Sequence, residues 1–201
     1  SDTIKFRLGI DRNLRDGYIN NRTGIGPDKF NNLNYWSVRA SLLADLAPNL
    51  ENYTIFTWSR TDTNGMLGHE VACNRATVAG STGFFAPVRA AACAQLDRET
   101  AAGFDFYDAE NNLPNPFVKQ KFWQLINTTT WKVNDTLTVK NIASYAVARE
   151  SYSFNITGDN TGVYVTNTFP GPNTGQDNRR NFTEELQFQG HSADDRLTWQ
   201  A

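Results

Sequence analysis

The sequence is poor in the residues that build catalytic and metal sites. Its 201 residues include two histidines, two cysteines and one methionine. His69 and His191 lie in different predicted connections, so they are not expected to share a metal ion. The "GHE" at 68–70 lacks the second histidine of a zinc-protease helix, and no phosphate loop of the GxxxxGK type occurs. We therefore expect no catalytic residue, no metal site, no cofactor and no enzymatic activity.

The chain also lacks a strong charge imbalance and a long apolar run. Its formal net charge is -2, whereas nucleic-acid-binding domains usually carry a basic stripe. No nucleic-acid partner is therefore expected. No stretch reaches the ~18 consecutive apolar residues that a transmembrane helix needs.

Alternating strands dominate what is present. Hydrophobic residues make up only 39% of the chain, but aromatic residues reach 12%. Apolar and polar residues alternate in "TIKFRLGIDR" from Thr3, "YWSVRASLLADLA" from Tyr35 and "NFTEELQFQG" from Asn181. Further strand-like segments are "YTIFTWSRTD", "KFWQLINTTTW", "TLTVKNIASYAVARE" and "RLTWQA". The pattern predicts an all-β protein whose antiparallel strands have one wet face.

Short and long connections alternate along these strands. The short ones are 48–52, 133–135 and 190–195, and the long ones are 13–33, 62–120 and 151–179. In an antiparallel sheet, this alternation gathers all long connections at one end. Outer-membrane barrels have this arrangement, because their periplasmic turns are short and their extracellular loops are long. We therefore expect an antiparallel meander, open at both edges, that forms part of a large transmembrane β-barrel.

The two faces of this meander are expected to differ. The concave face should carry Arg7, Arg39 and Glu185, and the convex face should carry Phe6, Val38 and Phe188. Such a barrel is apolar toward lipid and polar toward its lumen. Five aromatic residues are expected near strand ends, where an interfacial aromatic girdle would place them: Tyr35, Trp36, Trp58, Trp123 and Trp131.

Several segments resemble the barrel of TonB-dependent outer-membrane receptors. They are "RDGYINN", "NYWSVRASLLADLAPNLENYTIFTWSRTD", "WKVNDTLTVKNIASYAVARE" and "NFTEELQFQGHSADDRLTWQA". The hairpin "EELQFQG...DDRLTWQA" is the most characteristic of them. The resemblance covers most strand regions and little of the long loops. The chain departs from the family pattern in showing no TonB box, no N-terminal plug domain and no terminal aromatic residue of a final strand.

The resemblance implies active import of a scarce solute across the outer membrane of a Gram-negative bacterium, with the long loops extracellular. The solute would be a siderophore, a vitamin or an oligosaccharide. Implied partners are outer-membrane lipid, a small-molecule ligand, and the TonB, ExbB and ExbD energy-coupling complex acting through the missing plug. A passive porin-type channel and a secreted soluble β-domain that binds carbohydrate remain alternatives.

The resemblance also bears on the extent of the chain. Transporters of this type have about 22 strands, and the chain opens on the strand-like "SDTIKFRLG" rather than on a signal peptide. Residues 1–201 are therefore interpreted as one partial barrel domain, an internal stretch of a longer protein. Flanking coding sequence with a plug and a TonB box would decide against the porin.

Candidate substrate-binding residues come from strands with polar inward positions. The candidates for ligand binding on the lumen side are Arg39, Arg60 and Glu185. The alternative is that they only face water in the lumen or contact the missing plug. The 62–120 connection also carries Phe84, Phe85, Phe104, Phe106 and Tyr107. These aromatic residues could form a ligand platform or the loop's own small core, and the small core is the favoured interpretation.

Cys73 and Cys93 lie in this same long connection. Export permits their oxidation, and we expect a disulfide between them, with two buried free thiols as the alternative. The segment "PVRAAACAQLDRETAAG" predicts a short helix, with Pro87 in its first turn and Gly103 as its stop.

Overall fold

The fold is taken from a computed structural model of the chain. It describes residues 3–80, 82–83, 86–155, 157–158, 160–162, 164–167, 177–192, 194 and 196–201. Phe84 and Phe85, two aromatic residues of the long connection, lie outside the described residues.

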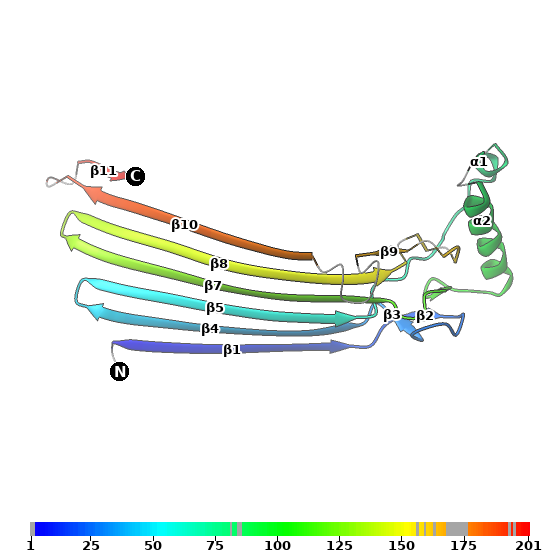
Figure 1. Ribbon diagram of the computed structural model, residues 1–201, viewed down its shortest axis with the longest axis horizontal. Coiled ribbons are helices and arrows are strands. Elements are labelled where there is room, and N and C mark those ends of the chain that lie inside the picture. The colour runs from blue at the N-terminus through cyan, green and yellow to red at the C-terminus, as the bar shows by residue number, and fades with distance from the viewer. Residues whose placement is uncertain are drawn as a thin grey trace.

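Most of the chain forms one antiparallel sheet (Figure 1). Its path is β1 (Ile4–Arg15), β4 (Leu33–Ala47), β5 (Leu50–Thr63), β7 (Phe117–Asn134), β8 (Leu137–Phe154), β10 (Asp177–His191) and β11 (Thr198–Gln200). The short β9 (Val165–Thr166) adds to β8. The long strands of this sheet pair in the order in which they follow one another along the chain. In the described residues β1 pairs only with β4 and β11 only with β10. The antiparallel meander with two open edges is therefore confirmed.

The connections at the two ends of the sheet are very different. Pro48 and Asn49 join β4 to β5, where the proline ring fixes the turn backbone. Asp135 and Thr136 join β7 to β8, and the Asn134 side chain accepts a hydrogen bond from the Thr136 N–H at 3.0 Å. The long connections gather at the opposite end, where the helices lie (Figure 1).

The pairing register separates the side chains of the sheet into two faces, because side chains alternate along a strand while paired residues share a face. Phe6 lies opposite Leu42 and Val38 opposite Ile10, whereas Arg7 lies opposite Ser41. The face with Phe6, Val38 and Phe188 is called the apolar face, and the one with Arg7, Arg39 and Glu185 the polar face. This grouping of the six residues is as the sequence predicts.

The exposed large hydrophobic side chains of the long strands lie on the apolar face. Apart from Leu46, which sits in a β-bulge, they are Ile4, Phe6, Leu8, Ile10, Leu14, Trp36, Leu42, Phe56, Leu125, Trp131, Phe182, Leu186 and Phe188. Trp36 and Trp131 lie near strand ends as expected. For Trp58 and Trp123 that expectation is wrong, because they face each other inside β5 and β7.

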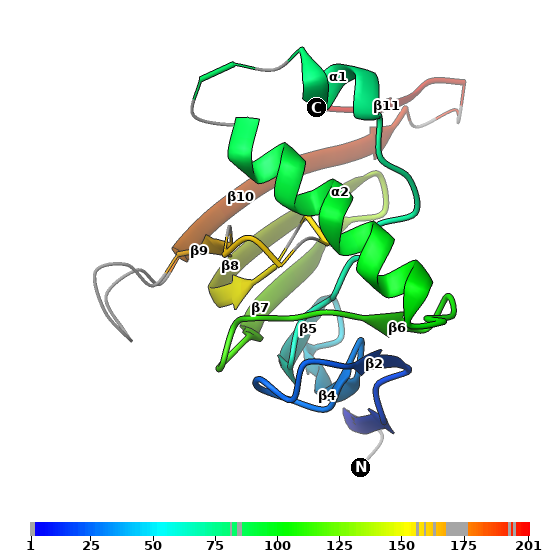
Figure 2. The same cartoon turned by 90° about the vertical axis from the view of Figure 1, so that its right-hand side faces the viewer.

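A second, three-stranded sheet lies at the long-connection end. It consists of β3 (Lys29–Phe30), β2 (Ile19–Asn21) and β6 (Asp108–Ala109), with β2 and β6 parallel. Viewed from this end, α2 (Ala86–Ala101) crosses in front of the strand ends (Figure 2). Pro87 is the second residue of α2, and Gly103 has a φ of 72° just beyond its end. No helix among the described residues is long and apolar enough to cross a bilayer.

The cluster of buried apolar residues lies in the long connections, whereas Val147 is the one buried apolar residue in the described strands of the large sheet. Ile19, Phe30, Leu67 and Ala109 form this cluster. Gly17 packs against the Phe30 backbone so closely that a Cβ atom would collide with its carbonyl group. We call the connections 16–32 and 64–116, with the described part of 155–167, the loop-end assembly. The large sheet itself is a single layer (Figure 1).

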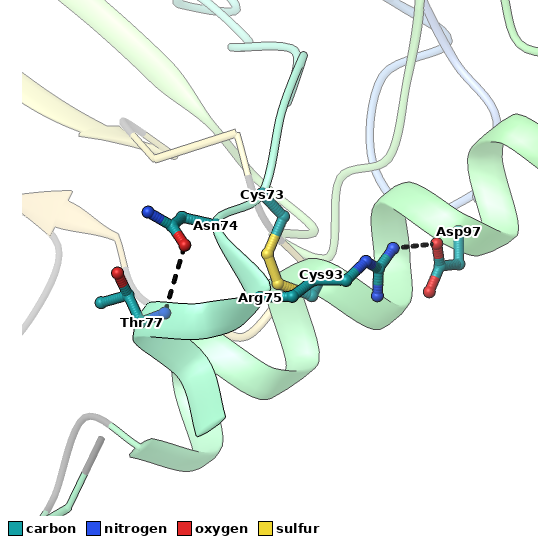
Figure 3. Close-up of a disulfide and its surroundings, with 6 residues drawn as sticks. All are labelled: Cys73, Asn74, Arg75, Thr77, Cys93 and Asp97. Atoms are coloured by element: carbon teal, nitrogen blue, oxygen red, sulfur yellow. Dashed lines mark hydrogen bonds and ion pairs between the residues drawn. A yellow bond between two sulfur atoms is a disulfide. The ribbon is translucent and has the colours of Figure 1, made fainter. Parts of the chain in front are cut away.

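A disulfide cross-links two segments of the loop-end assembly (Figure 3). Cys73 and Cys93 are bridged with a Cα separation of 5.4 Å, inside the usual range. The bridge joins the segment before α1 (Arg75–Ala79) to α2. Asn74 caps α1 by accepting a hydrogen bond from the Thr77 N–H at 3.2 Å.

We predict that Cys73→Ser with Cys93→Ser destabilises this assembly selectively. The bridge closes a separation of 20 residues, so its loss should cost about 3 kcal/mol. Amide hydrogen exchange should accelerate in α1 and α2 but not in β5, β7 or β8. The control is Arg75→Ala, which removes only an exposed ion pair to Asp97 and should leave exchange in α2 unchanged. Unchanged exchange in the cysteine variant would contradict the prediction.

Candidate ligand-binding site

The structure does not bring Arg39, Arg60 and Glu185 together. Arg39 lies opposite Gly9 and Thr57, and Glu185 opposite Ile142, both on the polar face. Three strands separate β4 from β10, so these two residues are about 19 Å apart across the sheet.

Arg60 is misplaced by the sequence interpretation. It lies opposite Trp36 and Lys121, on the apolar face, so the expectation that it shares a face with Arg39 and Glu185 is wrong. The cause is the mixed pattern of β5, where Ile55 and Phe56 are adjacent and point to opposite faces. Alternation alone therefore does not tell which residues of β5 point to which face of the sheet.

The polar face has a groove around Arg39. A cavity of about 290 Å³ is lined by Arg7, Gly9, Arg39, Ser41 and Tyr53. Gly9 lies opposite Arg39, and its missing side chain opens the groove. Among the described residues, neither Arg7 nor Arg39 forms an ion pair. Two guanidinium groups beside a tyrosine suit an anionic group of a ligand, because guanidinium binds carboxylate and phosphate through paired hydrogen bonds.

The loop-end assembly presents a chain of neighbouring aromatic rings, of which Tyr18, Phe106 and Tyr107 are exposed and His69 is half-buried. Ring centroids are 6.3 Å apart for Tyr18 and Tyr107, 5.4 Å for Tyr107 and Phe106, and 6.4 Å for Phe106 and His69. Phe106 is 68% exposed, Tyr107 50% and Tyr18 46%. The small-core interpretation is therefore wrong for Phe106 and Tyr107. We call Tyr18, His69, Phe106 and Tyr107 the aromatic cluster.

Buried Asp108 fixes the position of this cluster. Its carboxylate accepts hydrogen bonds from Asn20 at 3.0 Å and from Arg22 at 2.8 Å. Its backbone carbonyl lies 2.8 Å from Nδ1 of His69. Burial alone would raise the pKa of Asp108, but the hydrogen bonds from Asn20 and Arg22 outweigh it and lower the pKa below its ordinary value of 3.8.

The other end of the cluster is held by β1. The Arg15 guanidinium lies 5.3 Å from the centre of the Tyr18 ring and donates to the Asn31 carbonyl at 3.1 Å. Asn31 donates from its amide to the Tyr18 hydroxyl at 3.1 Å. Arg15 and Asn31 thus hold Tyr18 in place. The Tyr18, Tyr107 and Phe106 rings meet edge to face, and their exposed apolar surface suits contact with an apolar part of a ligand.

Buried polar side chains of α2 lock the rest of the assembly. Gln95 donates to Glu99 at 2.8 Å and to the Gly158 carbonyl at 3.1 Å. Burial raises the pKa of Glu99 above its ordinary value. Arg98 forms a forked ion pair with Glu110, at 2.6 and 3.2 Å. These contacts tie α2 to the connections before β7 and after β8.

No ready-made metal site accompanies the aromatic cluster. The described part of the chain holds no group of three or more His, Cys, Asp or Glu side chains arranged to bind a metal ion.

Comparisons with protein-family models, with curated proteins and with solved structures find no match to this chain. With no relative to transfer a role from, the residues of the chain itself carry the functional proposal.

We predict that Asp108→Asn weakens the assembly and removes part of its acid sensitivity. Because the folded pKa of Asp108 is lowered, its ionised form stabilises the fold above about pH 4, and this contribution is lost as the pH falls through the folded pKa. Losing charge-assisted bonds to Asn20 and Arg22 should cost about 1–3 kcal/mol at neutral pH. Hydrogen exchange in β2 and β6, measured at neutral and acid pH, checks this.

The control for this prediction is Asp97→Asn, which removes an exposed carboxylate that binds only Arg75 among the described residues. Its exchange profile should match that of the unsubstituted chain. An Asp108→Asn variant that loses protection in acid just as the unsubstituted chain does would overturn the role given to Asp108.

Proposed function

We propose that this chain forms part of the wall of an outer-membrane β-barrel that imports a scarce solute with energy supplied through TonB. One observation carries the proposal: the exposed large hydrophobic side chains of the long strands lie on a single face of a single-layer sheet. In water such an exposed apolar face would promote aggregation. Against lipid it is the expected surface, with the polar face toward the lumen.

The height of the apolar face is consistent with a bilayer. Apolar or small residues occupy this face of β4 from Trp36 to Ala44, about nine residues, close to what a tilted transmembrane strand needs. A polar patch interrupts it, but its members bond one another. Asn52 and Asn127 exchange hydrogen bonds at 3.0 and 3.1 Å, and Asn141 donates to Glu184 at 3.1 Å. Mutual bonding reduces the cost of placing such groups in an apolar medium.

Solute capture is assigned to the loop-end assembly. The aromatic cluster would stack on a ring of the solute, and the groove at Arg7 and Arg39 would bind an anionic group as the solute passes along the polar face. Binding and release suffice for this role, and no bond is made or broken. A passive porin would share the same wall. The folded, disulfide-bonded assembly over the strand ends favours a receptor.

Cysteine accessibility tests the wall. In the intact protein in its membrane, Phe56→Cys and Leu125→Cys, on the apolar face, should react with a membrane-soluble maleimide and resist a charged one. Their sequence neighbours Thr57→Cys and Gln124→Cys, on the polar face, should show the reverse. Reaction of all four variants with the charged reagent would mean that both faces meet water, and would contradict the proposal.

Uptake tests the import step. Phe106→Ala with Tyr107→Ala should lower the affinity for the imported solute by roughly tenfold, since each aromatic contact contributes about 0.5–1.5 kcal/mol. A labelled ferric siderophore, a corrinoid vitamin and a maltooligosaccharide are the solutes to try. Tyr164→Ala removes another exposed tyrosine outside the cluster and should leave uptake unchanged. Uptake that persists without a proton gradient would favour the porin.

A further inference from the structure

The apolar face ends in cations on the side of the long connections. One line of paired residues crosses the sheet there: Arg12 with Trp36, Trp36 with Arg60, Arg60 with Lys121, and Lys121 with Arg149. We call Arg12, Arg60, Lys121 and Arg149 the basic row. All four are exposed, and the row spans four strand spacings, about 19 Å.

More cations and few anions flank the basic row on the same face. Lys119 lies opposite Asp62 just beyond it, and Arg180 lies opposite Val147 one pair nearer the apolar band. Asp62 is the only carboxylate that the register places on this face at this level, and it pairs with Arg60 at 3.0 Å. At the same level the opposite face carries Asp11, Glu150 and Asp177, together with Arg179, which pairs with Asp177. Cations thus outnumber anions on the apolar face at this level, and anions outnumber cations on the opposite face.

One end of the basic row borders a cavity with two arginines and one carboxylate in its lining. A cavity of about 250 Å³ is lined by Arg12, Asn34, Trp36, Arg60 and Asp62. The Arg12 guanidinium lies 4.8 Å from the centre of the Trp36 ring and is oriented by bonds to Asn34 at 2.9 Å and to the Tyr35 carbonyl at 3.0 Å. Among the described residues, Lys121 and Arg149 have no ion pair.

We infer that the basic row binds the phosphates of anionic lipid headgroups in the leaflet on the long-connection side. The next line of paired residues is apolar, with Ile10, Val38, Trp58, Trp123 and Val147. A headgroup on the row therefore places its acyl chains on the apolar band. A soluble phosphate or a nucleic acid would leave that band uncovered, so the lipid is the one partner that matches both parts of the surface. This inference rests on the proposed membrane location and adds a lipid preference to it.

The test uses the intact protein reconstituted into phosphatidylcholine vesicles with and without phosphatidylglycerol. Quenching of tryptophan fluorescence by brominated lipids gives the ratio of association constants for the two lipids. The unsubstituted protein should prefer phosphatidylglycerol, and the preference should fall as salt is raised. Arg60→Gln with Lys121→Gln should lower the ratio roughly tenfold, since two cations near a charged bilayer surface are removed.

The matched control is Lys132→Gln with Lys140→Gln, which removes the same charge from the opposite face at the far end of β7 and β8. Its lipid preference should remain that of the unsubstituted protein. Equal preference in the basic-row variant and the control would overturn the lipid site while leaving the membrane wall intact. Absence of quenching by either brominated lipid would mean that the protein does not insert, and would overturn the proposed function as well.

Discussion

The register of the backbone hydrogen bonds is the constraint on which the rest of the structure depends. A shift of one residue between β4 and β5 would carry Phe56 and Trp58 to the polar face and Thr57 to the apolar one. The same shift would break the line from Arg12 through Arg60 to Arg149. The apolar band, the groove at Arg39 and the basic row are therefore properties of the pairing, and no single strand has them.

A single-layer sheet cannot stabilise itself as a packed domain does, because its faces bury little apolar surface. In this chain the compact packing is placed at one end, where Ile19, Phe30, Leu67 and Ala109 are buried. Asp108 and Gln95 complete it with hydrogen bonds between distant segments. The loop-end assembly thus has a defined surface of its own. The single-layer sheet has an apolar face that a surrounding medium would have to cover.

The sequence predicts those parts of the fold that repeat along the chain. Alternation in β1, β4 and β10 is clear enough to assign their faces, and the spacing of turns is enough for the meander. Alternation fails in β5, where Ile55 and Phe56 are both large and apolar, so the pattern predicts the wrong face for Arg60. β6 has two residues and no period, and its parallel pairing with β2 depends on a tertiary contact. The sequence does not predict the exposure of Phe106 and Tyr107, because composition does not distinguish a covered aromatic residue from an uncovered one.

The parallel pairing of β2 with β6 also has a kinetic consequence. Asn20 meets Asp108 across a long stretch of chain that contains two complete hairpin strands, whereas β4 with β5 and β7 with β8 meet across tight turns. Contacts of short sequence separation form first, because closing a long segment costs more chain entropy. The hairpins should therefore precede the loop-end assembly in folding. The surface that would meet a solute is then the last part of the chain to take shape.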